Sequence, residues 1–255
     1  SAKIDSKVRR LGGGFGGKES QATIFAAMSA LGAFITQKPV KIRLNRHTDM
    51  TATGKRHNFK VFFTVGFTAT GKLLALDIKL LSNGGNVLDL SGPVMTRALT
   101  HLDNCYFIKS LKAVGYVCKT NTVSNTAFRG FGGPQGMLTI ENIIYSVSQY
   151  LNRPIDEIRK VNYYSSQNGL KTPYGQIVKN PRIEKILNEI KKLSNYNERI
   201  KERYIENFAM FFMPSLLIVG STRNQWPIIM DENTADINKI GMRFLILLKP
   251  MTFNE

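Results

Sequence analysis

The chain has 255 residues, with 35 Lys and Arg against 18 Asp and Glu, giving a formal net charge of +17. A hydrophobic content of 43% is enough for a packed core and excludes a globally disordered chain. Two cysteines, Cys105 and Cys118, cannot form a disulfide framework, so we expect small, buried free thiols in a reducing, cytoplasmic setting. The sequence has neither a signal-like segment nor an apolar run of about 18 residues, so we expect no export and no membrane span.

The positive charge by itself does not indicate nucleic-acid binding. The basic residues are dispersed, with no long run and no regular alternation with aromatic residues. Two cysteines without a pair of neighbouring histidines also exclude a zinc finger. Two interpretations stay open: a solvated Lys-rich surface, or a basic pocket for an anionic cofactor or for partner chains.

Hydrophobic periodicity predicts mixed helices and strands. Apolar residues at three- and four-residue spacing indicate helices, and alternating β-branched and aromatic residues indicate strands. The predicted order is a helix over Ser20–Thr36, strands over Pro39–Leu44, Phe59–Phe67, Lys72–Leu81 and Leu111–Cys118, then helices over Gln135–Leu151, Pro154–Val161 and Arg182–Leu193. Thr68–Gly71 is the turn between the second and third strands, and Pro134 falls in the first turn of its helix. The fold class is therefore α+β (mixed α/β).

The character of the chain changes after residue 206. Phe208–Gly220 is an apolar run interrupted by Pro214, and Phe244–Leu248 is a second short apolar run. Both are expected as buried strands. We predict one unit over residues 1–206 and a divergent tail over residues 207–255.

The sequence Gly-Phe-Gly-Gly occurs twice, at Gly14–Gly17 and at Gly130–Gly133, each time ahead of a predicted helix. Around the first copy, Gly12, Gly14 and Gly17 also match G-x-G-x-x-G, but the strong preceding strand and the later acidic residue of a dinucleotide-binding fold are missing. Free N–H groups near helix starts attract anions, so two such loops can hold one anionic ligand. The alternative is two ordinary glycine turns before helices.

Around these loops the sequence resembles the molybdenum-binding subunit of the xanthine dehydrogenases, within the xanthine oxidase / aldehyde oxidase family. The matching stretches are Arg10–Ser20, Thr53–Phe59, Asp89–Pro93, Arg97–Tyr106, Lys119–Met137 and Thr172–Gln176. The likeness runs over roughly Lys3–Lys192, and the variants at Leu90–Pro93 and Thr172–Gln176 are more similar to the bacterial type. The resemblance implies the incomplete molybdopterin-binding domain of that family.

The resemblance also implies a cofactor, in which a pterin dithiolene and not the protein holds the molybdenum. Phe15 and Gly16 match the loop beside the metal, and Ala127, Phe128 and Arg129 match the segment whose backbone contacts the pterin and the metal ligands. The nucleotide extension of the pterin stays open. A [2Fe-2S] and FAD subunit or module is the implied partner, with NAD as electron acceptor.

Three further matches concern the substrate. Phe131 matches the ring that stacks on a flat heteroaromatic substrate, and Glu19 and Arg97 match the catalytic pair that orients a purine. Aldehyde oxidases usually lose this pair, so the resemblance favours hydroxylation of hypoxanthine and xanthine towards urate, with water as the oxygen source. Taken alone, Glu19 also suits a carboxylate in the first turn of a helix, and Arg97 suits a surface ion pair.

The resemblance stops after about residue 206. The catalytic base of the family is a Glu in a Gly-x-Gly-Glu motif, and this motif does not occur in the sequence. We therefore expect this chain to be part of a subunit and to be inactive when isolated. The alternatives are a molybdenum hydroxylase similar to aldehyde oxidase, and a non-catalytic fragment that binds partner chains or anions.

Overall fold

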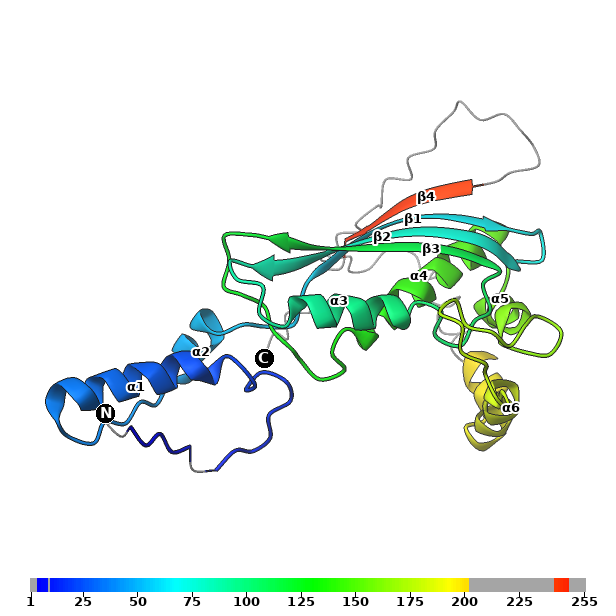
Figure 1. The fold of residues 1–255 in the computed structure, drawn as a ribbon. Coiled ribbons are helices and arrows are strands. Elements are labelled where there is room, and N and C mark those ends of the chain that lie inside the picture. Colours follow the sequence, from blue (N-terminus) through cyan, green and yellow to red (C-terminus); the bar gives the residue numbers. More distant parts are fainter. Residues whose placement is uncertain (1–3, 9, 202–240, 248–255) are drawn as a thin grey trace, which may run out of the picture.

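The computed structural model describes residues 4–8, 10–201 and 241–247, and its centre is a mixed four-stranded sheet with helices on one face (Figure 1). This arrangement confirms the α+β (mixed α/β) class. The described elements are α1 (Ala22–Thr36), α2 (Arg46–Ala52), β1 (Phe59–Phe67), β2 (Leu73–Gly85), α3 (Ser91–Thr100), β3 (Ser110–Lys119), α4 (Gly133–Leu151), α5 (Ile155–Asn162), α6 (Ile183–Leu193) and β4 (Gly241–Leu247).

The sheet has the strand order β3-β2-β1-β4. β1 and β2 form the predicted antiparallel hairpin, and the Gly71 N–H donates to the Thr68 carbonyl at 2.8 Å to close its turn. β3 pairs parallel with β2, and β4 pairs antiparallel with β1. The crossover from β2 to β3 contains α3, so the sheet places this helix beneath its strands (Figure 1).

The core lies between the sheet and α4. Along β1, Phe59, Val61, Phe63 and Val65 are buried and the residues between them are not, as period-two alternation requires. α4 contributes the fully buried side chains of Ile140, Ile143, Ile144 and Val147. Each buried side chain of this size contributes about 1.5–3 kcal/mol, so this face fixes the register of the sheet.

Helices α5 and α6 are joined to this core by ion pairs. Arg159 of α5 donates to Glu141 of α4 at 2.9 Å, and Lys191 of α6 donates to Asp156 of α5 at 2.7 Å. In α6 the predicted apolar face is only partly used. Ile183 and Leu187 pack against the core, whereas Ile186 and Ile190 are exposed.

The strand predicted over Pro39–Leu44 is wrong, because these residues have no regular secondary structure. Pro39 lacks an N–H, and no described strand lies beside the segment to accept hydrogen bonds. Val40 instead packs on Gly32 of α1. Helices α2 and α3 were not predicted. Their signals are the Asn45 side chain, which accepts from the Thr48 N–H at 2.8 Å, and the apolar spacing of Val94, Met95 and Ala98 in α3.

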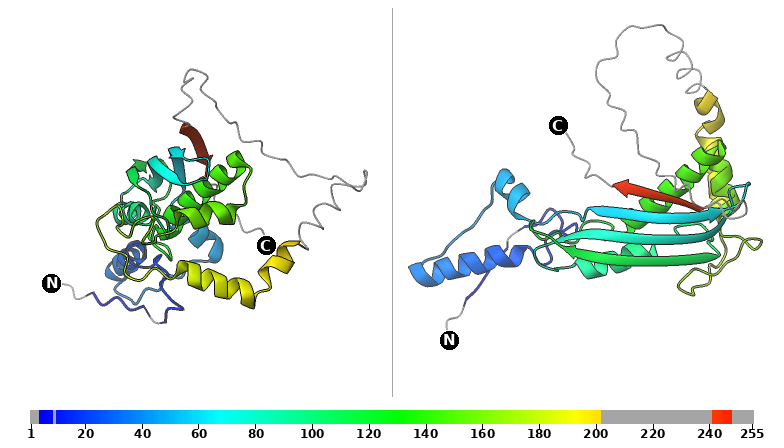
Figure 2. Two further views of the ribbon diagram at one scale, coloured as in Figure 1. Left: turned by 90° about the vertical axis from the view of Figure 1, so that its right-hand side faces the viewer. Right: turned by 90° about the horizontal axis from the view of Figure 1, so that it is seen from above.

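Helix α1 and helix α2 extend away from the sheet as an arm (Figures 1 and 2). None of the residues of α1 is buried, although the helix is almost entirely apolar. Among the described residues no helix is both long and apolar enough to cross a membrane.

The predicted boundary at residue 206 lies within residues 202–240, which are outside the described part of the chain. Of the tail, Gly241–Leu247 forms β4, which confirms a strand at the second apolar run. The predicted strand over Phe208–Gly220 lies outside the described residues, and the division into residues 1–206 and 207–255 stays a prediction.

Candidate functional site

The two Gly-Phe-Gly-Gly copies adopt the same backbone turn. In the first loop, Gly14–Gly17, Phe15 has φ 48° and Gly16 has φ 90°; in the second loop, Gly130–Gly133, Phe131 has φ 51° and Gly132 has φ 98°. In both loops the N–H of the last glycine donates to the carbonyl of the first, at 3.0 and 2.9 Å. Positive φ at both central positions marks a type I′ turn, which is uncommon for bulky residues such as phenylalanine.

Only the second loop opens directly into its helix. Gly132 is the N-cap of α4, and Pro134 lies in the first turn as predicted. The first loop ends at Gly17 and α1 begins at Ala22, slightly later than the predicted start at Ser20. A bend separates the first loop from its helix.

The fold brings the two loops into contact. A Cβ on Gly16 would lie 2.9 Å from the Ala127 carbonyl carbon and 3.0 Å from the Phe128 nitrogen. Gly16 therefore rests directly on the Ala127–Phe128 backbone, a position that only glycine fits. Gly12, Gly14 and Gly17 have open space where a side chain would stand. The ring of Phe15 lies over Gly13 and is 58% exposed, so it is not part of the core.

Helix packing explains Gly132 of the second loop and Gly136 of α4. A Cβ on Gly132 would overlap the Val94 carbonyl oxygen, and one on Gly136 would overlap the Ala98 carbonyl oxygen. Both contacts are with α3, so these glycines let α3 and α4 approach closely. Only part of the glycine pattern therefore points to a ligand.

The segment Lys55–His57 runs along the second loop and contacts it at several points. The Lys55 N–H donates to the Asn125 side chain at 3.3 Å, and the Gln135 side chain donates to the His57 carbonyl at 3.4 Å. Between these contacts, Arg56 donates from Nη2 to the Arg129 carbonyl at 2.7 Å. The Arg56 guanidinium also lies over the Phe128 ring, with its carbon 4.5 Å from the ring centroid.

A cluster of polar side chains next to the loops consists of His57, Ser91, Asp89 and Gln21. His57 and Ser91 are buried, and His57 Nε2 lies 2.6 Å from Ser91 Oγ. Burial lowers the pKa of His57, and the nearby Asp89 carboxylate opposes this effect. Partial burial raises the pKa of Asp89, but hydrogen bonds from its neighbours outweigh burial and hold that pKa below its ordinary value. Gln21 donates to Asp89 at 3.1 Å and accepts from the Gly54 N–H at 3.0 Å, which ties the start of α1 to this group.

Two of the predicted substrate residues share a pocket and the third does not. Arg97, in the last turn of α3, and Phe131, in the second loop, line a pocket of about 520 Å³. Glu19 is exposed between the first loop and α1 and does not line this pocket. It also precedes the first turn of α1, so the alternative role as a first-turn carboxylate is wrong. Within the described part of the chain, neither Glu19 nor Arg97 has an ion pair.

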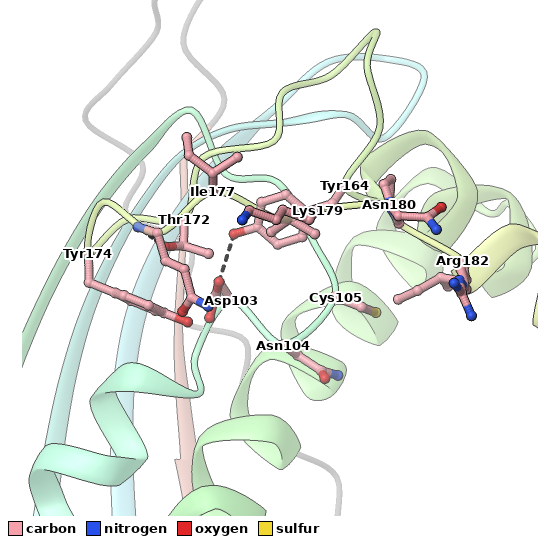
Figure 3. A pocket seen from close by; sticks show the side chains of 14 residues that line it. Asp103, Asn104, Cys105, Tyr164, Thr172, Tyr174, Ile177, Lys179, Asn180 and Arg182 are labelled. Carbon is pink, nitrogen blue, oxygen red and sulfur yellow. Dashed lines mark hydrogen bonds between the residues drawn. The ribbon is translucent and has the colours of Figure 1, made fainter.

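A larger pocket of about 810 Å³ contains none of the predicted site residues. Figure 3 shows the Tyr164 hydroxyl pointing to Asp103, to which it donates at 2.6 Å. Burial raises the pKa of the Asp103 carboxyl, against the hydrogen bond from Tyr164 that lowers it. Burial also raises the pKa of the Cys105 thiol in this pocket to about 11. Cys105 and Cys118 are both free and half-buried.

Residues 1–163 match the molybdopterin cofactor-binding domain. The chain belongs to this family. It is 46% identical over 200 residues to a xanthine dehydrogenase of Oryza sativa subsp. japonica, a match that covers 78% of this chain and 14% of that protein. It is 44% identical over 207 residues to a nicotinate hydroxylase of Emericella nidulans, covering 81% of this chain and 15% of that protein. The chain thus spans about one seventh of the length of these relatives.

Solved structures of molybdenum enzymes share the fold. The aldehyde oxidoreductase of Desulfovibrio gigas superposes with a TM-score of 0.64 at 26% identity, over 71% of this chain and 20% of that one. The CO dehydrogenase of Oligotropha carboxidovorans superposes with a TM-score of 0.68 at 18% identity, over 80% of this chain and 26% of that one. The second likeness concerns the fold alone. The expected molybdopterin-binding domain of the xanthine oxidase family is thereby confirmed.

The residues of the two loops fit a molybdopterin cofactor. Gly14 and Gly17 of the first loop have open space where a side chain would stand, so a flat anionic group can approach the bare backbone there. The Nη1 group of Arg56 and the Oε1 atom of Gln135 are buried and have no hydrogen-bond partner among the described residues. In the same part of the chain no three His, Cys, Asp or Glu side chains gather in a metal-binding group.

Sequence reasoning missed the supporting residues beneath the loops. Arg56 and His57 stand in one of the stretches that carry the family resemblance, but they received no role. The local signal is a basic pair just before a strand, which is common on protein surfaces. Their contacts with residues some 70 positions later appear only in the folded chain.

Proposed function

We propose that this chain forms one wall of the cofactor and substrate site of a molybdenum hydroxylase that converts hypoxanthine and xanthine towards urate. The observation that carries the proposal is the pocket shared by Arg97 and Phe131. This pocket places a cation and an aromatic ring next to the loop that contacts Gly16. A flat heterocycle that gains negative charge during the reaction requires both groups.

Phe15, Gly16 and the Ala127–Arg129 backbone would hold the molybdopterin. The first loop offers glycine N–H groups, and the Ala127–Arg129 backbone is contacted by both Gly16 and Arg56. When bound, the cofactor supplies the oxygen-atom and electron transfer of the hydroxylation. The protein's own residues position the cofactor and the substrate against each other.

Arg97 would act on the substrate as an electrostatic catalyst. Negative charge builds on the heterocycle as its carbon is attacked, and a guanidinium that donates to the developing oxyanion stabilises the transition state. Phe131 would stack on the ring and fix its plane. Glu19 would bind the N–H or carbonyl edge of the purine from the side of the first loop. The catalytic base would be a Glu outside these 255 residues, so the isolated chain would not turn over substrate.

Electrons would leave through [2Fe-2S] clusters and FAD on a partner subunit or module, with NAD as acceptor, in the cytoplasm. The relatives support this proposal because the xanthine dehydrogenase they include is about seven times longer than the matched segment. We do not expect nucleic acid or membrane among the partners.

A second candidate function is hydroxylation of a smaller substrate. The nicotinate hydroxylase of Emericella nidulans is almost as similar as the xanthine dehydrogenase, and the aldehyde oxidoreductase of Desulfovibrio gigas shares the fold. Nicotinate is a flat nitrogen heterocycle with a carboxylate, and Arg97 and Phe131 suit it as well. An aldehyde would need neither residue.

Replacing Arg97 tests the substrate class. In the intact protein that carries this segment, Arg97→Met should lower kcat for xanthine by about two to three orders of magnitude, since one lost oxyanion donor has an effect of this size. Small aldehydes should remain substrates. Arg153→Met is the matched control, because Arg153 pairs with Glu157 on the surface. Unchanged xanthine turnover in Arg97→Met, or turnover of nicotinate but not of xanthine by the wild type, would refute the purine assignment.

A further inference from the structure

We propose that Arg56 is a positioning residue that fixes the second glycine loop against the first. The proposal rests on the proposed function for its chemical meaning, since Ala127–Arg129, the segment that leads into the second loop, is the one assigned to the molybdopterin. The positioning itself concerns residues of this chain alone. The described contacts of Arg56 are with Phe128 and Arg129, not with the three residues assigned to the substrate, Glu19, Arg97 and Phe131.

Arg56 holds two consecutive residues of the loop at once. Its Nη2 group donates to the Arg129 carbonyl at 2.7 Å, and its planar face lies over the Phe128 ring at 4.5 Å. A guanidinium makes both contacts because it combines a rigid fork of donors with a flat face. An ammonium group offers a point charge and cannot donate in the plane and stack at the same time.

The neighbours of Arg56 anchor the segment on both sides of this contact. The Thr126 N–H donates to the Lys55 carbonyl at 3.1 Å, before the loop residues that Arg56 holds. The Gln135 side chain donates to the His57 carbonyl at 3.4 Å, after them. Arg56 therefore spans the stretch between two fixed points. Among the described side chains of Lys55–His57, that of Arg56 alone contacts Phe128 and Arg129.

Gly16 contacts the same stretch of backbone one to two residues earlier, at Ala127 and Phe128. The Gly16 position leaves 2.9 Å between a Cβ and the Ala127 carbonyl carbon, so the two loops are in direct contact there. Ala127–Arg129 is thus contacted both by a glycine of the first loop and by the guanidinium of Arg56. A shift at Arg56 moves the face of the second loop relative to the first, and this spacing decides how a shared ligand fits.

One donor group of Arg56 is unpaired among the described residues. Its Nη1 group is buried and has no hydrogen-bond partner among the described residues, and burial lowers the pKa of the guanidinium. A buried, unpaired donor is costly, which makes Arg56 a poor choice for stability alone. A role in placing the loop explains why the chain keeps a charged group at this position.

Amide hydrogen exchange on the full chain tests the positioning without any cofactor. Arg56→Met should speed exchange of the Phe131 and Gly133 amides, which bond within the loop, by about tenfold or more, because a charge-assisted hydrogen bond is lost. Amides of β1 and β2 should stay within about twofold of the wild type. Arg56→Lys should give an intermediate effect in the loop. Lys79→Met is the matched control, since Lys79 lies over the Tyr116 ring at 5.4 Å on the open face of the sheet.

Equal acceleration of the loop and of the sheet would show a general loss of stability and overturn the proposal, as would no change in the loop. A second readout uses molybdopterin itself. At equal molybdenum content, the electron paramagnetic resonance spectrum of the half-reduced metal should differ between wild type and Arg56→Met; identical spectra would overturn the proposal. If the wild type binds no molybdopterin, the proposed function fails, while the exchange result still decides the role of Arg56.

Discussion

Phe131 combines two features that are uncommon for a phenylalanine that only packs in a hydrophobic core. Its backbone has φ 51°, in the left-handed region, and its side chain is only half-buried beside Arg97. A bulky residue in this conformation is strained, and strain of this kind concentrates at functional sites. The loop therefore holds the ring at the pocket at some cost in stability.

Replacing this ring should separate substrate binding from cofactor binding. In the intact protein, Phe131→Ala should raise KM for xanthine by about tenfold, the equivalent of one lost stacking contact, while molybdenum content stays within about twofold. Phe128→Ala is the contrasting variant, because Phe128 stacks on Arg56 and not on the pocket. Loss of molybdenum in Phe131→Ala would show that the ring supports the loop instead of the substrate.

The buried pair of Asp103 and Tyr164 makes the stability of the fold depend on pH. Because burial raises the folded pKa of Asp103 above its ordinary 3.8, the carboxyl favours its protonated form in the folded state. The contribution of Asp103 to the free energy of unfolding is therefore largest below pH 3.8. It is lost as the pH rises through the pKa that Asp103 has in the folded state.

An amide at this position should remove that dependence. Asp103→Asn keeps an oxygen acceptor, and its NH2 group donates to the Tyr164 hydroxyl. The difference in free energy of unfolding between wild type and variant, measured by urea titration at pH 3.5 and about pH 7, should shift in favour of the variant at the higher pH. A difference that does not change with pH would contradict the raised pKa of Asp103.

At the scale of elements, the approach of α3 to α4 depends on glycine. Gly132→Ala places a methyl group onto the Val94 carbonyl oxygen at a residue with φ 98°, so both the contact and the backbone oppose it. We expect a loss of about 2 kcal/mol or more in the free energy of unfolding, measured by denaturant titration. The pocket of Arg97 and Phe131 should also be disturbed, since it is lined by α3 and by Phe131, the residue next to Gly132.

The control for this substitution is Gly92→Ala, which changes a glycine in the first turn of α3. Gly92 has nothing within 4 Å of a built Cβ, and alanine is the better helix former. This variant should be neutral or slightly more stable. Equal destabilisation by both substitutions would contradict the packing role of Gly132.

At the scale of the whole molecule, the open question concerns residues 207–255. The sequence predicts a divergent tail, and β4 within it pairs with β1 along Gly66↔Gly241 to Lys60↔Leu247. Our prediction is that limited proteolysis begins beyond about Asn207 and leaves a resistant N-terminal piece. A chain ending at residue 206 should then unfold at the same denaturant midpoint as the full chain.

Mass spectrometry of the resistant piece decides between the two possibilities. If residues 241–247 are as resistant as the second loop, the tail belongs to the fold and the predicted boundary is wrong. The loss of β4 would then expose the edge of β1, and the truncated chain should aggregate more readily.

The sequence alone determined the features that depend on neighbours along the chain. Strand-type residue patterns in the sequence placed β1 and β2, and three- and four-residue spacing of apolar residues placed α1 and α4. The repeated Gly-Phe-Gly-Gly pointed to two matching turns. Together with the family resemblance, these signals were enough for the fold class, whereas the roles of Arg97 and Phe131 stay predictions.

Only the tertiary structure decided which of these pieces meet. A strand needs a neighbour to accept its hydrogen bonds, so Pro39–Leu44, with a strand-like pattern, stayed irregular beside α1. The contact of Gly16 with Ala127 and the reach of Arg56 to Arg129 join residues far apart in the chain. Local patterns carry no information about such pairs, because packing of the whole core sets the distance between them.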